Sequence, residues 1–175
     1  MKAVAAMRPG YDWTCIEYDF GAKQTYAIAN KYQVWRLVLS ILIHDSFLHL
    51  FWNCFSLFMI GFIVEAEFSG NKNKYELLLL LGGLGGNLAS AVMRPYDIGV
   101  GASGCIFAIL GAFAVFIYIN WDRLGDNAVL FIMFFGILFF FSLMNALSSP
   151  QIDIWTHLGG LAVGLPMGAL YLRAD

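Results

Sequence analysis

Five long runs almost without charge restrict the folds that are open to this 175-residue chain. Each run is close to the ~20 residues that a helix needs to cross the hydrocarbon core of a bilayer. The runs cover residues 47–64, 75–93, 103–120, 128–147 and 154–172. Because 60% of the chain is hydrophobic and only 13% is charged, a soluble domain could not cover itself with polar surface. We therefore expect an all-α, polytopic integral membrane protein with about five transmembrane helices.

The amino-terminal part differs from the rest of the chain. Charged residues interrupt it at Asp12, Glu17, Asp19 and Lys23. No apolar core of the signal-peptide type is visible there. An apolar piece at 34–43 contains Arg36 and Ser40, which favours an interfacial helix over a span. The sequence thus predicts an extramembranous segment at 1–36 and a transmembrane domain at 37–175.

Charge and cysteine content narrow the range of partners and cofactors. The net charge of -2 provides no basic stripe, so a nucleic-acid partner is not expected. The three cysteines, Cys15, Cys54 and Cys105, show neither metal-ligand spacing nor the pattern of a disulfide framework. We interpret Cys54 and Cys105 as buried apolar fillers. The sequence predicts no metal site and no organic cofactor.

Polar side chains inside the apolar runs are the first candidates for a functional site, because a polar group in hydrocarbon must find a partner. His49 and Asn53 are four residues apart in the first run, so a helix places them on one face. His157 lies near the start of the last run, and three glycines follow it on the same helical face. These are Gly160, Gly164 and Gly168. The histidine face is therefore predicted to contact a closely packed neighbour.

A second row of small residues in the third run matches this glycine face. Gly104, Ala108 and Ala112 recur at four-residue spacing, which lets two helix backbones approach each other in lipid. If the third and fifth runs pack along these rows, Ser103 at the start of one meets His157 near the start of the other. The sequence thus predicts a Ser-His pair at one end of the bundle.

Such a pair is chemically meaningful. A serine hydroxyl needs an adjacent base to become a nucleophile, and histidine is the usual base. The oxyanion that forms needs fixed donors, which the Ser103 N–H at a helix start, His49 and Asn53 could supply. Gly101 and Gly104 flank the serine closely and permit a tight turn and a close approach of the substrate backbone.

Other interpretations fit single features. The pattern "GASG" at 101–104 also suits plain helix packing, and "GGLGG" at 82–86 is predicted to be packing. His49 and Asn53 could form an interhelical hydrogen bond. His157 could be a buried structural histidine, or a haem or quinone ligand, although the histidines lack the companions of a two-haem bundle. The joint pattern favours the nucleophile hypothesis.

The joint pattern also resembles the rhomboid intramembrane serine proteases. The segment "VWRLVLSILIHDSFLHLFWN" is similar to the family's Trp-Arg segment and the histidine and asparagine that follow it. "GASG" is similar to its G-x-S-G motif, and "HLGGLAVG" to its last helix. The resemblance implies Ser103 as nucleophile, His157 as general base, and His49 and Asn53 as oxyanion donors. It also implies a rhomboid-like helical bundle that cleaves transmembrane protein substrates in the bilayer.

Two departures from the family pattern raise an alternative. Rhomboids usually have a further helix before the Trp-Arg pair, and no apolar run precedes Trp35 here. Other membrane subunits could take the place of that helix. Phe107 stands where the family commonly has a tyrosine below the serine, a change that keeps the ring and that we expect to be tolerated. The alternative hypothesis is a rhomboid-like protein without proteolytic activity, serving as a structural or adaptor subunit of a larger membrane complex.

Overall fold

Helices occupy all five of the predicted spans. The computed structural model describes residues 12–68, 72–148 and 153–172. The long helices are α5 (Phe47–Glu67), α6 (Lys72–Met93), α7 (Ser103–Ile119), α9 (Asp126–Ser148) and α10 (Ile154–Tyr171). Helices α5 and α6 are long and apolar enough to cross a membrane, and the apolar helices at 103–119 and 126–140 are shorter. The predicted all-α, polytopic membrane fold is confirmed.

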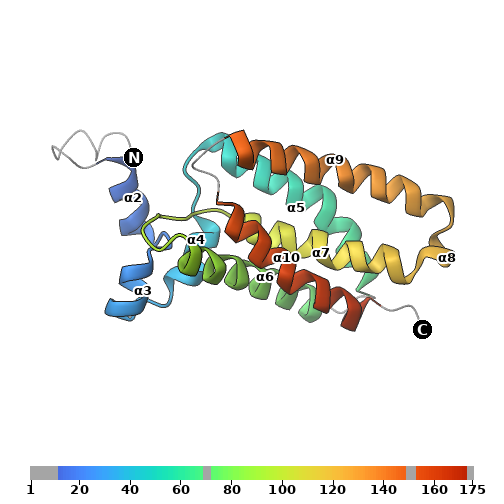
Figure 1. The fold of residues 1–175 in the computed structure, drawn as a ribbon, viewed down its shortest axis with the longest axis horizontal. Coiled ribbons are helices and arrows are strands. Elements are labelled where there is room, and N and C mark those ends of the chain that lie inside the picture. The colour runs from blue at the N-terminus through green and yellow to red at the C-terminus, as the bar shows by residue number, and fades with distance from the viewer. Residues whose placement is uncertain (1–11, 69–71, 149–152, 173–175) are drawn as a thin grey trace.

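Helix α7 lies in the middle of the bundle (Figure 1), with α10 and α6 on one side and α5 and α9 on the other. The short α8 (Trp121–Leu124) connects α7 to α9 at one end. At the opposite end lie three more short helices, close to where α5, α7 and α10 begin. These are α2 (Trp13–Phe20), α3 (Thr25–Lys31) and α4 (Arg36–Leu42).

The core is centred on α7, which buries side chains on every face. The ring of Phe113 on α7 stacks on that of Phe135 on α9, with 4.3 Å between the ring centroids. On α5, Ile60 and Val64 belong to the same buried cluster. In a soluble protein, burial of an apolar side chain stabilises the fold by about 1.5–3 kcal/mol because the side chain leaves water. Between helices in lipid, the stabilisation comes from close packing instead.

Helix α10 packs against α7 through the two predicted rows of small residues. A Cβ added to Gly160 would lie 3.1 Å from the Gly104 Cα, and one added to Gly164 would lie 2.8 Å from the Ala108 Cα. A Cβ added to Gly168 would likewise lie 2.7 Å from the Ala112 Cα. Since no side chain separates the two backbones, the predicted packing of these helices is confirmed. Pro166 lies within α10, which continues through it.

The glycine-rich turn of α6 completes this packing from a third side. A Cβ added to Gly86 would lie 3.2 Å from the Gly104 Cα, and one added to Gly85 would lie 3.2 Å from the Gly159 carbonyl oxygen. The prediction that the glycines at 82–86 serve packing is therefore confirmed. The backbones of α6, α7 and α10 are therefore in direct contact here, next to the start of α7.

The amino-terminal segment contains two helices, α2 and α3, that the sequence analysis did not predict. Asp12 caps α2 by accepting a 3.0 Å hydrogen bond from the Cys15 N–H, and Gly21 ends it at φ 112°. Arg36 is 5% exposed and donates from Nη1 to the carbonyl oxygens of Tyr18 at 2.6 Å and Ala22 at 3.1 Å. The guanidinium thus ties the end of α2 to the start of α4.

The prediction that Cys54 and Cys105 are both buried is wrong for Cys54. Cys105 is buried, as expected, but Cys54 is exposed. Its neighbour on α5, Asn53, is the residue that faces the bundle. Because successive residues on a helix point in directions about 100° apart, Cys54 is turned outward toward the region that lipid would occupy. The cause is the rotation of α5 about its axis, which the composition of an apolar run does not reveal.

Candidate active site

Ser103 is the first residue of α7, at the end of the bundle where α5 and α10 also begin (Figure 1). The residue before it, Ala102, makes no side-chain capping hydrogen bond. The first N–H groups of a helix have no acceptor within the helix, so the Ser103 amide is free to bind an external oxygen. Gly104 is buried against α6 and α10, which places the serine directly beside the contact of these three helices.

The turn that leads into Ser103 is held from two other helices. Gly101 has φ 112°, and its N–H donates to the Ser40 carbonyl oxygen at 2.9 Å. The Ser40 hydroxyl accepts a 2.9 Å hydrogen bond from Asn87 Nδ2 of α6. Ser40 and Asn87 are both buried. A chain of hydrogen bonds thus fixes the approach to the serine.

His49 and Asn53 of α5 lie beside this turn. A Cβ added to Gly101 would lie 2.7 Å from His49 Cε1, 2.8 Å from His49 Nε2 and 3.6 Å from Asn53 Nδ2. Asn53 Nδ2 also donates to the His49 carbonyl oxygen at 3.1 Å. A glycine at this point leaves the space that the His49 ring occupies, while Asn53 lies at ordinary contact distance. The structure therefore brings His49 and Asn53 to the turn two residues before Ser103.

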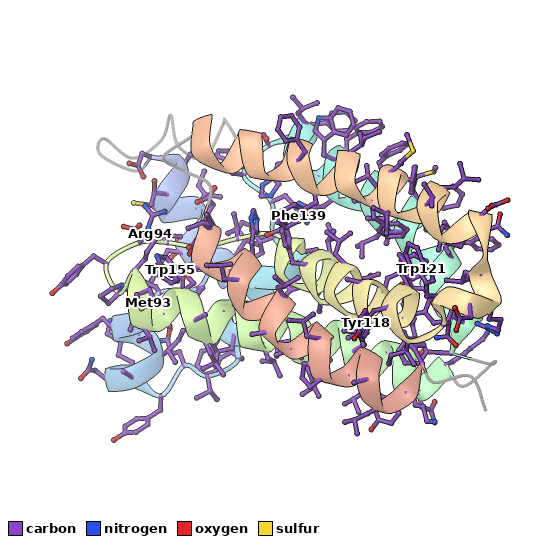
Figure 2. The ribbon with its side chains drawn as sticks, turned by 45° about the vertical axis from the view of Figure 1, so that its right-hand side comes forward. Met93, Arg94, Tyr118, Trp121, Phe139 and Trp155 are labelled. Atoms are coloured by element: carbon purple, nitrogen blue, oxygen red, sulfur yellow. The ribbon has the colours of Figure 1, made fainter. Side chains whose placement is uncertain are left out.

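His157 is 8% exposed and lies on α10 against α7. Its ring is stacked on Phe107 with 4.2 Å between centroids and 6° between the planes. Phe107 in turn makes an edge contact with Phe139 of α9 at 5.9 Å. In Figure 2, Phe139 points from α9 toward the start of α7. The phenylalanine that stands where rhomboids commonly have a tyrosine thus provides a flat support for the histidine.

Ser103 and His157 lie on the two helices that touch at Gly104 and Gly160. Among the residues that the structure describes, no hydrogen bond joins the serine to the histidine. Catalytic hydrogen bonds are often long or open before substrate binds, and backbone contact between the helices keeps the two residues near each other.

The start of α10 is anchored by a residue that the sequence analysis missed. Asp153 caps α10 by accepting a 3.0 Å hydrogen bond from the Trp155 N–H, and its other oxygen accepts from the Ser90 hydroxyl of α6. Trp155 lies at the same end of the bundle as Arg94, at the end of α6 (Figure 2). An aspartate just before an apolar run is a helix-start signal, and it could have been recognised.

A third histidine and a carboxylate lie next to His49. Asp45 Oδ1 is 2.9 Å from His49 Nδ1, and the His44 ring is 5.0 Å from the His49 ring. Burial lowers the pKa of His44, and the nearby His49 lowers it further. Within the described ranges, no group of three His, Cys, Asp or Glu residues has an arrangement that could hold a metal ion.

The fold and the site define an all-helical integral membrane protein with serine, histidine and asparagine gathered at one end of the bundle. The Rhomboid domain family matches residues 31–174. RHOMBOID-like protein 1 of Arabidopsis thaliana is 32% identical over 153 residues, which cover 87% of this chain and 38% of that protein. Rhomboid-like protease 1 of Toxoplasma gondii is 33% identical over 159 residues, 87% of this chain and 52% of its own length.

The chain belongs to the rhomboid family. It also matches Rhomboid-like protease 3 of Toxoplasma gondii, 29% identical over 86% of this chain and 56% of that protein. The chain spans about half or less of the length of these relatives.

Proposed function

We propose that this chain is an intramembrane serine protease that uses Ser103 as nucleophile and His157 as general base. The observation that carries the proposal is the meeting of two helices at Gly101: His49 and Asn53 contact it from α5, and Ser103 follows it at the start of α7. The backbone contact of α7 with α10 adds His157 to this arrangement. Two of the relatives described above are named rhomboid-like proteases, which supports the same function.

In the proposed reaction, Ser103 Oγ attacks the scissile carbonyl carbon of the substrate while His157 accepts the hydroxyl proton. The carbonyl π electrons move to oxygen, and the Ser103 N–H, His49 and Asn53 donate hydrogen bonds to the resulting oxyanion. When the tetrahedral intermediate collapses, the peptide C–N bond breaks and His157 returns its proton to the leaving amine. Water, activated by the same histidine, then hydrolyses the acyl-enzyme.

The position of the site suggests the class of substrate. Ser103 lies at the start of an apolar helix whose residues are mostly buried, and the surrounding bundle exposes apolar side chains to lipid. A peptide bond can reach this site from within or beside the bilayer, so we propose transmembrane proteins as substrates, cleaved near the end of their spans. The proposal also includes further membrane subunits as partners, packed against the amino-terminal part of the bundle in place of the usual first helix.

Labelling with a fluorophosphonate probe tests the proposal. The purified chain in detergent should be labelled, whereas Ser103→Ala and His157→Ala should not. Ser56→Ala, one turn beyond Asn53 on α5, is the matched control and should be labelled like the natural chain. If a folded natural chain is not labelled, with or without added membrane extract, the protease proposal is wrong. A search for a larger complex in which the chain is a non-proteolytic subunit would then follow.

A further inference from the structure

The contact between Asp45 and His49 has a chemical consequence for the oxyanion site. Asp45 lies between α4 and α5, four residues before His49, and its Oδ1 is 2.9 Å from His49 Nδ1. Ser46, the next residue, caps α5 by accepting a 3.2 Å hydrogen bond from the His49 N–H. The cap holds the first turn of the helix in place, so the carboxylate and the imidazole face each other in a fixed geometry.

An ionised carboxylate only accepts hydrogen bonds, so Nδ1 of His49 must carry a proton to bond with Asp45. A neutral imidazole carries one proton in total. With that proton on Nδ1, the other nitrogen, Nε2, can accept a hydrogen bond but cannot donate one. Nε2 donates only when the ring carries both protons.

Nε2 is the nitrogen that faces the proposed oxyanion position. The Cε1–Nε2 edge of the His49 ring is turned to Gly101, and the Nδ1 edge is turned to Asp45. An acceptor at Nε2 would repel the oxyanion, whereas a donor would stabilise it. The contact with Asp45 therefore decides whether His49 helps or hinders catalysis.

We propose that Asp45 is a positioning residue that fixes a proton on His49 Nδ1, so that His49 serves as an oxyanion donor only as the doubly protonated ring. The inference rests on the proposed function, because it assigns a role to His49 in that reaction. The reaction then requires two histidines in different protonation states, because the base His157 must be neutral while His49 must be charged. Its rate should therefore fall when His49 loses a proton.

Among the described residues, three other titratable groups lie near this pair. His44, in the same connection, packs its ring against His49. Glu17 of α2 is close enough to Asp45 for the two charges to repel each other, and burial together with Asp45 raises the pKa of Glu17. His157 of α10 lies within electrostatic range of His49. Asp45 is the group in hydrogen-bond contact with the His49 ring, so its carboxylate dominates the placement of the ring proton.

The position of the proton can be measured without any activity. The chain has three histidines, so a side-chain ¹⁵N NMR spectrum of the detergent-solubilised protein contains few signals. His44→Gln and His157→Ala assign them. In the alkaline spectrum, once the ring is neutral, we expect His49 to be the Nδ1–H tautomer. In Asp45→Ala the Nε2–H tautomer should increase. An Nε2–H tautomer in the natural chain would overturn the inference and leave the proposed function intact.

The pH profile of fluorophosphonate labelling provides the second readout. For the natural chain we expect the rate to fall about tenfold per pH unit on the alkaline side, to a total of roughly 10²-fold, the loss that follows removal of one oxyanion donor. In Asp45→Ala the neutral ring can donate from Nε2, so the alkaline fall should shrink to less than about twofold. Asp122→Asn, at the far end of the bundle, is the control and should keep the natural profile.

The two measurements separate the possible failures. Absent labelling at every pH overturns the proposed function, and the NMR result still stands. Labelling without an alkaline fall in the natural chain overturns the inference alone. Equal alkaline falls in the natural chain and Asp45→Ala also overturn it, because the fall then has another cause.

Discussion

Gly101 has a backbone conformation that residues with a side chain rarely adopt, with φ 112°. The absence of a Cβ also leaves the space in which the His49 ring lies. One residue thus satisfies two separate requirements of the site, a sharp turn before α7 and close contact with α5. Its neighbours in the sequence, by contrast, are constrained by helix packing, as Gly104 is.

A substitution at Gly101 should therefore reduce the function more than backbone strain alone would predict. Gly101→Ala places a methyl group 2.8 Å from His49 Nε2, so the ring must move. The rate of Ser103 labelling should then fall at least about tenfold. Complete loss of one oxyanion donor lowers a rate by about 10²–10³-fold, and a displaced donor loses part of that effect. The measurement is the rate of fluorophosphonate labelling.

Gly125→Ala is the control for this prediction. Gly125 also has a positive φ, 51°, but nothing lies within 4 Å of an added Cβ. Its substitution should cost about 1 kcal/mol of stability and leave labelling unchanged. Equal labelling of the two variants would contradict the role given to the contact between Gly101 and His49.

At the scale of elements, the pairing of α7 with α10 sets the distance between Ser103 and His157. Small residues at four-residue spacing let the two backbones touch, and Gly85 and Gly86 of α6 close the third side. The anchoring of α10 by Asp153 and Ser90 then fixes its position along the axis of the bundle. Helix packing and capping together place His157 relative to Ser103.

Widening this pairing should lower both stability and activity. Gly164→Ala puts a methyl group 2.8 Å from the Ala108 Cα, so the helices must separate, at a cost of about 1–3 kcal/mol. The midpoint of unfolding in detergent should fall, and so should labelling of Ser103. Gly136→Ala, on a face of α9 with nothing within 4 Å, is the matched control and should be neutral or slightly stabilising. Equal midpoints for the two variants would show that the helices do not pack as described.

At the scale of the whole molecule, the amino-terminal segment is attached to the loop that leads to Ser103. Lys23 forms an antiparallel bridge with Gly99, and its Nζ donates to the Arg94 carbonyl oxygen at 3.3 Å. Thr25 Oγ1 donates to the Ala91 carbonyl oxygen at 3.1 Å. Residues 12–36 thus contact the end of α6 and the segment that follows it. The predicted domain boundary at residue 36 stays a prediction.

Burial of Lys23 should make stability depend on pH. The side chain is 0% exposed, and burial lowers its pKa, although Asp153 and Asp97 oppose this effect. The unfolded chain then binds more protons than the folded one, so stability rises with pH up to about 10.5, the ordinary lysine value. Lys23→Met should flatten the rise in thermal midpoint as the pH increases toward about 10.5. Lys72→Met, at an exposed position, should keep it. If the thermal midpoint of the natural chain rises with pH no more than that of Lys23→Met, the prediction is wrong.

The sequence alone determined the five long helices, because apolar runs of spanning length can satisfy their backbone only as helices in lipid. It also determined which helices touch, since the rows Gly104–Ala108–Ala112 and Gly160–Gly164–Gly168 are periodic and can be seen in a single chain. Ser103, His157, His49 and Asn53 were selected by the same local spacing, and their catalytic roles remain a proposal.

Only the tertiary structure decided how the helices are rotated and what their ends contact. The outward position of Cys54, the chain of hydrogen bonds from Asn87 through Ser40 to Gly101, and the docking of α2 and α3 had no signal in the sequence. Each depends on residues that are far apart along the chain, or on the rotation of a nearly uniform apolar helix about its axis. Local periodicity carries neither kind of information, because it records which residues share a face, and not how a nearly uniform apolar helix is rotated or which distant residues its ends contact.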